Sequence, residues 1–420
     1  MKIAGKLYGV ILLLLVSSLF FSYKINSLCI IALLLTWLVE GGFVLKFRRL
    51  VREPFFLLSV LLFVLYLFSI TQSADKANAR FFVEKNLSLV VLPLVLLSKQ
   101  RFTQEEIFTL GKVFVAGTVL LMTVATIGAV RNYLLVHNID VFFYHKLPGS
   151  VGVSAIIASL FCILSLALLF YLPAGKWKGI AGVLLSVWLL LLASKLFLTV
   201  LCLMLLFNLA GKFGLRTKLL AGFVAVTFGI LLVAIPNPLT RRFSDMGKFH
   251  RYYLTAPVFN EGIYFDGLSL RLVYIRFGLE IMKEENSYWF GTGTGDAEAL
   301  LQQKIKAYHM YQGDGVVDKQ GYLQYGYHNE FLQKFVQLGI TGLSVFIALL
   351  VYSYYLAIRY RRPFLGNLLL LFTFSFFTDT LLEQQVGLVL FLTFSSIAIS
   401  EIRAGKEEKS RELSEAPLDQ

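Results

Sequence analysis

His328 is the residue of this chain whose position best suits chemistry. It comes directly before a segment that the sequence predicts to be a helix: Asn329 is a typical N-cap, and apolar residues recur after it at helical spacing. At a helix N-terminus the dipole favours anions and disfavours a charged imidazole. A neutral imidazole there can act as a general base on a charged substrate, whereas the alternative is a histidine that only packs or caps at the membrane interface.

Arg271 is the second candidate, because it lies in the first turn of a predicted amphipathic helix, residues 268–282. A cation is unfavourable at that end unless it has an anionic partner. A diphosphate held bidentately by the guanidinium would serve, and so would an ion pair with Glu261 or Asp266. The glycine-containing segment 289–295 resembles a phosphate cradle only loosely, so a turn that brings the chain back over the site is the better prediction.

Lys195 is the single charged residue in the apolar run 180–209. That run is too long for one membrane span and predicts a helical hairpin that turns near residues 193–195. A cation in or near the membrane is a candidate for function, although a lysine that snorkels to the interface is the plain alternative.

Arg241 and Arg242 follow a break at Pro236 and Pro238, which places them at the outer surface of the bilayer. They can reach a substrate phosphate or anchor the chain to lipid headgroups.

Two acids, Asp379 and Glu383, lie between the last two predicted spans, on the same outer side. They can orient Lys195 or Arg271, or cap a short turn. No metal or other cofactor is expected, because the remaining histidines and the three cysteines lack the spacing of metal ligands.

The composition is that of a membrane protein. Hydrophobic residues make up 57% of the chain, charged residues 15%, and the mean hydropathy is +0.72. An all-α polytopic membrane protein with about twelve transmembrane helices is therefore predicted. The apolar runs are 7–22, 27–45, 54–71, 87–98, 108–130, 150–172, 178–194, 196–211, 217–235, 337–358, 364–379 and 386–400. The run at 87–98 is short and is expected to tilt or to extend at its N-terminal side.

The distribution of basic residues predicts how the chain is oriented in the membrane. The net charge is +13, and every second loop between the apolar runs is basic, which places these loops and both termini in the cytoplasm. The predicted division is helices 1–9 in residues 1–235, an extracytoplasmic helical loop domain in 236–336, helices 10–12 in 337–402, and a disordered cytoplasmic tail in 403–420.

Together these features resemble the O-antigen ligase and O-antigen polymerase superfamily of bacterial envelope glycosyltransferases. The resemblance covers the helix number, the large outer loop before the tenth helix, and four local patterns. These are Ala193-Ser194-Lys195, Ser269-Leu270-Arg271 with a downstream Gly-x-Gly, His328 to Leu332 with residues 338–343, and Asp379 to Gln385 ahead of Val386-Gly387. The pattern around His328 is the most specific.

The resemblance implies a metal-independent, inverting transfer on the periplasmic face of the bacterial inner membrane. The donor would be a glycan on undecaprenyl diphosphate, and the acceptor a hydroxyl of lipid A-core or another glycan. Membrane lipid would surround the protein, and no nucleic acid would take part. His328 would be the base, and Arg271 and Lys195 would hold the diphosphate, with Arg241, Arg242, Asn329, Asp379 and Glu383 as further contacts. The superfamily typically has arginine where this chain has Lys195, so the carry-over to that residue loses bidentate geometry.

Three functions stay open from the sequence. The first is ligation of O-antigen to lipid A-core. The second is polymerisation of the carrier-linked glycan, or its transfer to protein, by the same chemistry. The third is transport of a lipid-linked sugar, for which internal repeats and broken helices near the middle of the bilayer would be expected.

Overall fold

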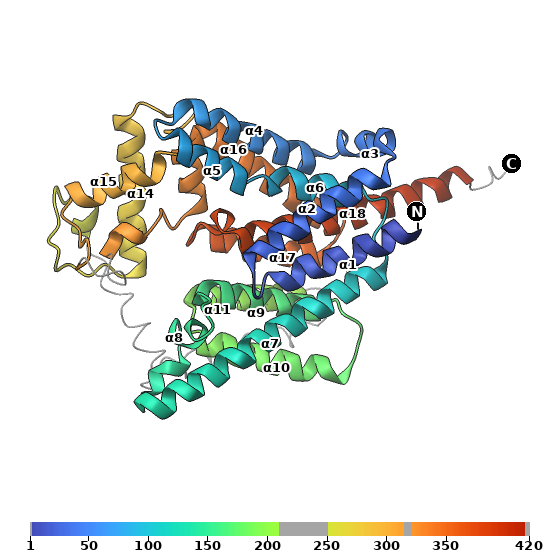
Figure 1. Ribbon diagram of the computed structural model, residues 1–420, viewed down its shortest axis with the longest axis horizontal. Coiled ribbons are helices and arrows are strands. Elements are labelled where there is room, and N and C mark those ends of the chain that lie inside the picture. Colours follow the sequence, from blue (N-terminus) through green and yellow to red (C-terminus); the bar gives the residue numbers. More distant parts are fainter. Residues whose placement is uncertain (1, 210–250, 315–320, 416–420) are drawn as a thin grey trace.

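The computed structural model describes residues 2–209, 251–314 and 321–415, and this part of the chain is helical, with no β-strand. Figure 1 shows most helices running along the long axis of the molecule. Their bounds are α1 (Lys2–Ser18), α2 (Tyr23–Glu40), α3 (Phe43–Leu50), α4 (Pro54–Gln72), α5 (Lys76–Lys85), α6 (Ser88–Ser98), α7 (Gln104–Val136), α8 (Lys146–Gly149), α9 (Ala155–Leu169), α10 (Lys176–Leu191), α11 (Lys195–Leu209), α14 (Gly267–Glu284), α15 (Ala297–Ala307), α16 (Glu330–Arg359), α17 (Pro363–Phe376) and α18 (Gln385–Glu415). Short 3-10 turns are η1 (Ile139–Phe142), η3 (Arg251–Leu254), η4 (Gly321–Gln324) and η5 (Leu381–Glu383).

Several helices are long and apolar enough to cross a membrane. Within the described ranges there are six such candidates: Tyr23–Glu40, Pro54–Gln72, Lys76–Ser98, Gln104–Val136, Glu330–Arg359 and Gln385–Lys406. Each predicted apolar run inside those ranges overlaps a helix, and run 27–45 is divided between α2 and α3 at Gly41 and Gly42. Run 217–235 and the end of run 196–211 lie outside the described residues. The short run at 87–98 does extend at its N-terminal side, because α5 continues into α6.

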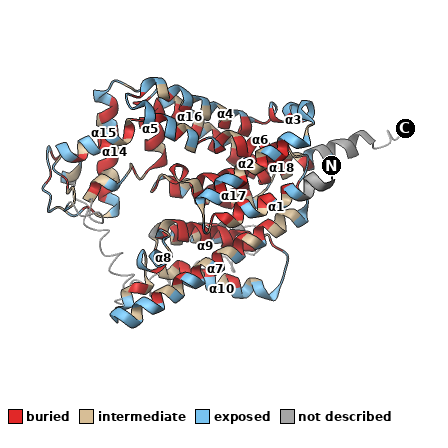
Figure 2. Ribbon diagram, viewed as in Figure 1, coloured by how far each residue is buried: buried red, intermediate tan, exposed pale blue. Residues whose placement is uncertain are grey.

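The outer faces of the bundle are apolar, as lipid contact requires. On α2, Leu28, Ile31 and Leu35 are each more than half exposed. Figure 2 shows further exposed positions on the outside of the bundle, α10 among them, while the inward faces are buried. Water would penalise such a continuous apolar surface, whereas lipid chains do not.

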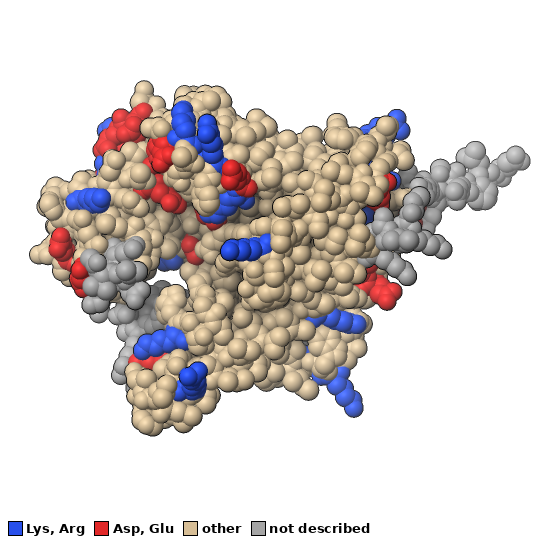
Figure 3. Space-filling model, in the orientation of Figure 1, with Lys and Arg blue, Asp and Glu red and all other residues tan. Residues whose placement is uncertain are grey.

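Charged side chains divide between the two ends of the molecule. Helix α1 begins and α18 ends at one end, and α14 and α15 form the other (Figure 1). Figure 3 shows Lys, Arg, Asp and Glu gathered towards these ends, with few between them. The basic segments meet at the first end: Arg403 donates to the Lys99 carbonyl at 2.8 Å, and Arg49 donates to the Ser98 carbonyl at 3.2 Å.

Residues 251–314 and 321–336, which we call the cap, pack around a second apolar core. Helix α14 begins after Asp266, whose carboxylate accepts from the amides of Leu268 and Ser269, and it buries Tyr274 and Phe277 against α15 and the start of α16. The predicted helix 268–282 is therefore confirmed, with one residue more at its N-terminal end and two more at its C-terminal end.

Helix α16 begins at Glu330, directly after the predicted cap Asn329, and it is interrupted at Gly339, close to the boundary expected at 336–337. One predicted boundary differs. The tail expected to be disordered after Ile402 continues as α18 to Glu415. Lys, Glu and Arg dominate that stretch; they are strong helix formers, and a helix already started needs no new nucleus to propagate.

Candidate functional site

His328 occupies the position expected of it, with a backbone geometry that the sequence did not reveal. It precedes α16, whose N-cap Asn329 accepts from the Leu332 amide at 2.9 Å. Its φ of 48° lies in the left-handed region, which is uncommon outside glycine and clusters at functional sites. The ring is nearly parallel to that of Tyr274, with centroids 6.3 Å apart, and 5.2 Å from that of Tyr325.

Asp379 is the partner of this imidazole. Its Oδ1 lies 3.4 Å from His328 Nδ1, and it also accepts from the Thr380 amide at 2.8 Å. The Asp379 side chain is 8% exposed and that of His328 is 23% exposed, so the histidine faces solvent while the acid lies behind it. A carboxylate at Nδ1 favours the tautomer in which Nε2 is free to accept a proton.

Arg271 contacts the residue that precedes Asp379. Its Nε donates to the Thr378 carbonyl at 2.8 Å, and its Nη1 donates to the Gly267 carbonyl at 2.6 Å. Burial lowers the pKa of Arg271, and Asp379 and Tyr144 oppose that effect electrostatically. Within the described part of the chain, Nη2 makes no hydrogen bond to protein, so the guanidinium keeps N–H groups that can bind an anion.

Tyr144 links this centre to the α10–α11 hairpin. Its amide donates to the Leu191 carbonyl at 3.0 Å, and it interacts electrostatically with Arg271. The hairpin turns as predicted, since α10 ends at Leu191 and α11 begins at Lys195. The segment that carries Tyr144 is thus hydrogen-bonded to the end of α10, just before the turn that leads to Lys195. Nothing in the sequence singled out Tyr144, because a lone tyrosine in an outer loop carries no pattern.

Figure 3 shows a hollow between the part of the molecule that carries α14 and the part that carries α8 and α11. Acidic and basic side chains lie at its edge. A concave region with converging charged groups is the kind of surface at which a charged ligand binds.

Glu383 lies elsewhere. Its Oε1 accepts from Lys334 Nζ at 2.9 Å, and Lys334 also pairs with Glu330 at 2.6 Å and donates to the Tyr66 hydroxyl at 2.6 Å. Lys334 is 1% exposed and Glu330 0%. We call these four residues, with Lys85 at 3.9 Å from Glu383 Oε2, the buried ion cluster. Its helical part could have been detected as an i, i+4 pair of opposite charges at the start of a predicted helix.

The glycine segment 289–295 is a packing device rather than a phosphate cradle. Three of its amides are already used: Thr292 donates to the Val336 carbonyl at 2.8 Å, Gly293 to that of Gln337 at 3.2 Å, and Gly295 to Ser73 Oγ at 3.0 Å. The first two bonds attach the segment to α16 close to its interruption at Gly339, and the third attaches it to the end of α4.

The predicted residues therefore fall into four groups. His328, Asn329, Arg271 and Asp379 come together, since Asn329 Nδ2 also donates to the Phe377 carbonyl at 3.4 Å. Glu383 belongs to the buried ion cluster, and Lys195 is placed by its backbone at the start of α11. Arg241 and Arg242 lie outside the described residues.

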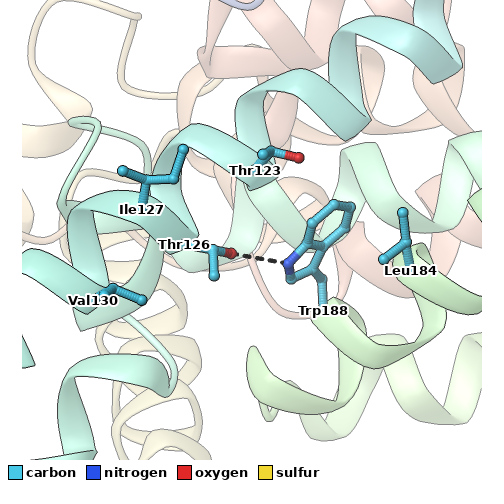
Figure 4. Close-up of a pocket in the computed structure, with 6 residues that line it drawn as sticks. All are labelled: Thr123, Thr126, Ile127, Val130, Leu184 and Trp188. Carbon is cyan, nitrogen blue, oxygen red and sulfur yellow. Dashed lines mark hydrogen bonds between the residues drawn. The ribbon is translucent and has the colours of Figure 1, made fainter.

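An apolar groove runs between α7 and α10. One part of it, a cavity of about 340 Å³ shown in Figure 4, is lined by side chains of these two helices. Trp188 Nε1 donates to Thr126 Oγ1 at 3.0 Å across it. The other lining residues are Thr123, Ile127, Val130 and Leu184. The lining of this cavity includes no titratable group, whereas Lys112 lines the adjoining part of the groove. The end of the cavity at Trp188 is one helical turn from Leu191, the residue bonded to Tyr144.

Comparison of the chain with protein-family models gives no match, and comparison with curated proteins gives none either. The site must therefore be interpreted from its own geometry.

Proposed function

We propose that this protein is an inverting membrane glycosyltransferase. It would move a glycan from undecaprenyl diphosphate to a hydroxyl of lipid A-core at the periplasmic face of the bacterial inner membrane. One observation carries the proposal. Two adjacent residues hold the two candidate groups: the Thr378 carbonyl accepts from Arg271, and Asp379 pairs with His328.

The two groups suit the two halves of a displacement. The acceptor oxygen forms a bond to the anomeric carbon from the face opposite the diphosphate, and the bond from that carbon to the diphosphate oxygen breaks. The diphosphate departs with the electron pair, and Arg271 stabilises the charge that develops on it. His328 takes the proton of the acceptor hydroxyl. The diphosphate is already a good leaving group, so the chemistry needs no nucleotide.

Lys195 and the pair Arg241–Arg242 complete this proposal as further cations for the donor phosphates. The placement of the α10–α11 turn beside Tyr144 supports the role of Lys195. The topology that goes with the proposal has about twelve spans and places α14, α15 and the start of α16 outside the cytoplasm.

The groove between α7 and α10 suits the prenyl chain of the donor. Its lining is almost wholly apolar, and it ends one turn from the Leu191–Tyr144 contact. A lipid chain in the groove would leave its diphosphate at the end of α10, near Arg271.

The test is transfer by the purified protein in lipid nanodiscs, with a polyprenyl-diphosphate glycan as donor and lipid A-core as acceptor. We expect a glycan–lipid A-core product and release of the polyprenyl diphosphate from the wild type, and at least tenfold less of both from Arg271→Ala. Absence of product from the folded wild type with every acceptor tried would exclude a transferase.

Polymerisation or transfer to protein would use the same two groups with a different acceptor. Offering carrier-linked glycan or a serine-containing peptide in place of lipid A-core separates these activities. A product that grows by whole repeats would identify a polymerase, and a glycopeptide would identify a protein glycosyltransferase.

One observation favours a transporter. Helix α16 is interrupted at Gly339, and its first part buries Glu330, Gln333 and Lys334, as a broken helix in a transporter would. Segment 289–295 fills the break by backbone contact, however, which leaves the break closed. Flux of labelled carrier-linked glycan across proteoliposomes without any product would support transport.

A further inference from the structure

The buried ion cluster lies next to the proposed site, and the proposed chemistry does not use it. It is charge-balanced, with Lys334 and Lys85 against Glu330 and Glu383, and the Lys334 and Glu330 side chains have at most 1% exposure. Closed in this way, it has no spare cation for a phosphate. A cluster of this kind is weak evidence for stability, because desolvating the charges offsets most of their attraction. Its use is better sought in what it connects.

The cluster connects α16, the helix that follows His328, to segment 378–383, which carries Asp379 and the Thr378 carbonyl. Glu330 and Lys334 lie in the first turns of α16, directly after His328. Glu330 Oε2 accepts from the Leu382 amide at 2.9 Å, and Lys334 Nζ donates to Glu383 Oε1. Both contacts attach the C-terminal end of segment 378–383 to α16. The N-terminal end of this segment carries the Thr378 carbonyl and Asp379.

We infer that Lys334, Glu330 and Glu383 are positioning residues, which fix segment 378–383 against α16 and so set the geometry between His328 and Arg271. The inference rests on the proposed function. A shift of this segment would move Asp379 away from His328 and the Thr378 carbonyl away from Arg271 at the same time. Misplacement of reacting groups by about 1 Å can reduce the rate by a factor of about 10².

The sharpest variant is Glu383→Met. It cuts the ionic link to segment 378–383 while Lys334 stays paired with Glu330 at i, i+4. The matched control is Glu280→Met, which removes another carboxylate that joins two elements of the cap, through Arg276 and Lys304. Both variants are compared with wild type in nanodiscs for unfolding midpoint, kcat, donor KM and backbone hydrogen exchange.

Glu383→Met is expected to lower kcat about 10- to 100-fold, with a smaller change in donor KM than Arg271→Ala produces. Amide exchange in 378–384 should become faster, while that in α14 stays as in wild type. Glu280→Met should keep the wild-type kcat. If Glu383→Met fails to fold, the triple variant Glu330→Gln, Lys334→Met, Glu383→Gln takes its place, because replacing the three most buried charges of the cluster together removes their desolvation cost as well.

If amides 378–384 exchange in Glu383→Met, or in the triple variant, at the wild-type rate, the inference is overturned, even where no transfer is detected. The inference is also overturned if that variant transfers glycan with the wild-type kcat. A wild type that folds but transfers no glycan would instead contradict the proposed function, and the exchange measurement would still decide whether the cluster holds the segment.

Discussion

His328 combines two properties that a purely structural residue would not need. It has a left-handed backbone, which costs free energy in a non-glycine residue, and its ring contacts two tyrosines and pairs with a buried acid. The ring contacts Tyr274 of α14, the helix that also carries Arg271. Asp379, which pairs with His328, follows Thr378, whose carbonyl accepts from Arg271.

Replacement of His328 tests the role of base directly. His328→Ala is expected to reduce turnover by about 10² to 10⁴, the usual contribution of a positioned base, while the protein still binds carrier-linked glycan. His328→Gln can hydrogen-bond the acceptor but cannot take its proton, so it should be nearly as slow. Single-turnover transfer and donor binding are the measurements. Recovery of most of the activity by Gln would show that His328 only positions the acceptor.

Lys195 can be tested by charge and by shape. If it holds the donor phosphate, Lys195→Ala should abolish transfer, and Lys195→Arg should retain much of it, because a guanidinium keeps the charge and binds phosphate well. Donor KM and kcat of the two variants decide. Near-normal activity in both would mean that Lys195 only reaches the interface.

Sequence reasoning reached single residues where a local rule applied. Asn329 was recognised as a cap and His328 as its neighbour, because capping depends on adjacent residues. The pairing of His328 with Asp379 joins positions 51 residues apart, and the Lys334–Tyr66 bond joins positions 268 apart. Such pairs depend on tertiary packing, to which spacing in one sequence gives no access.

At the scale of elements, the interruption of α16 is the feature that shapes the site. Gly339 has φ 68° and ψ −167°, a region open essentially to glycine alone. The freed backbone groups bond to the neighbouring segment: Ile340 donates to the Tyr288 carbonyl at 2.8 Å and Thr341 to that of Trp289 at 3.3 Å. The sequence showed two glycine-containing segments but not that each accommodates the other.

Gly339→Ala should therefore destabilise the protein by about 1–3 kcal/mol or more, from backbone strain alone. A Cβ there would also meet the Trp289 backbone. The matched control is Gly179→Ala in α10, where a Cβ meets nothing within 4 Å and alanine is the better helix former. Thermal unfolding midpoints in the same detergent compare the two. A midpoint for Gly339→Ala equal to that of the control would contradict this account of the break.

The α14–α15 pair is held by a smaller ionic network around Glu280. This carboxylate accepts from Arg276 Nε at 2.7 Å and from the Tyr308 hydroxyl at 2.9 Å, and it pairs with Lys304 at 3.2 Å. Burial raises the pKa of Glu280, but Arg276, Tyr308 and Lys304 outweigh burial and lower it below its ordinary value.

A lowered pKa in the folded state gives stability above the unfolded-state pKa of 4.5, and that stability is lost as the pH falls through the folded-state value. At pH 7, Glu280→Gln should therefore speed amide exchange in α15 relative to wild type. The difference should shrink as the pH falls below 4.5. Exchange rates corrected for the intrinsic pH effect are the measurement, and a difference that persists at low pH would assign the effect to packing.

Helices were predicted far better than their ends. The apolar runs located the long helices of the bundle, because lipid selects for apolar residues all along a span, whereas α5 and α8 lie outside every run. A boundary failed where another rule applied, because the charged residues after Ile402 continue a helix instead of ending it.

At the scale of the whole molecule, loops predicted to share one side of the membrane do meet. On the side that holds the site, the Ser73–Asp75 loop bonds to the 293–296 segment, Thr378 bonds to Arg271, and Tyr144 bonds to Leu191. At the opposite end, Arg101 pairs with Glu408 at 3.2 Å. The alternation of basic loops and the packing of the helices thus assign the same loops to the same end.

This agreement fixes which loops are together but not which end faces the cytoplasm, and the site depends on that. Labelling of single exposed cysteines determines which end faces the cytoplasm. The native Cys29, Cys162 and Cys202 are replaced first, and Gln302→Cys in the cap and Arg52→Cys in a basic loop then form a matched pair. The basic loops predict that a membrane-impermeant maleimide labels the Gln302 position in intact spheroplasts and the Arg52 position only after lysis. The reverse pattern would place His328 and Arg271 in the cytoplasm, where a carrier-linked glycan on the outer leaflet could not reach them, and would exclude the proposed transfer.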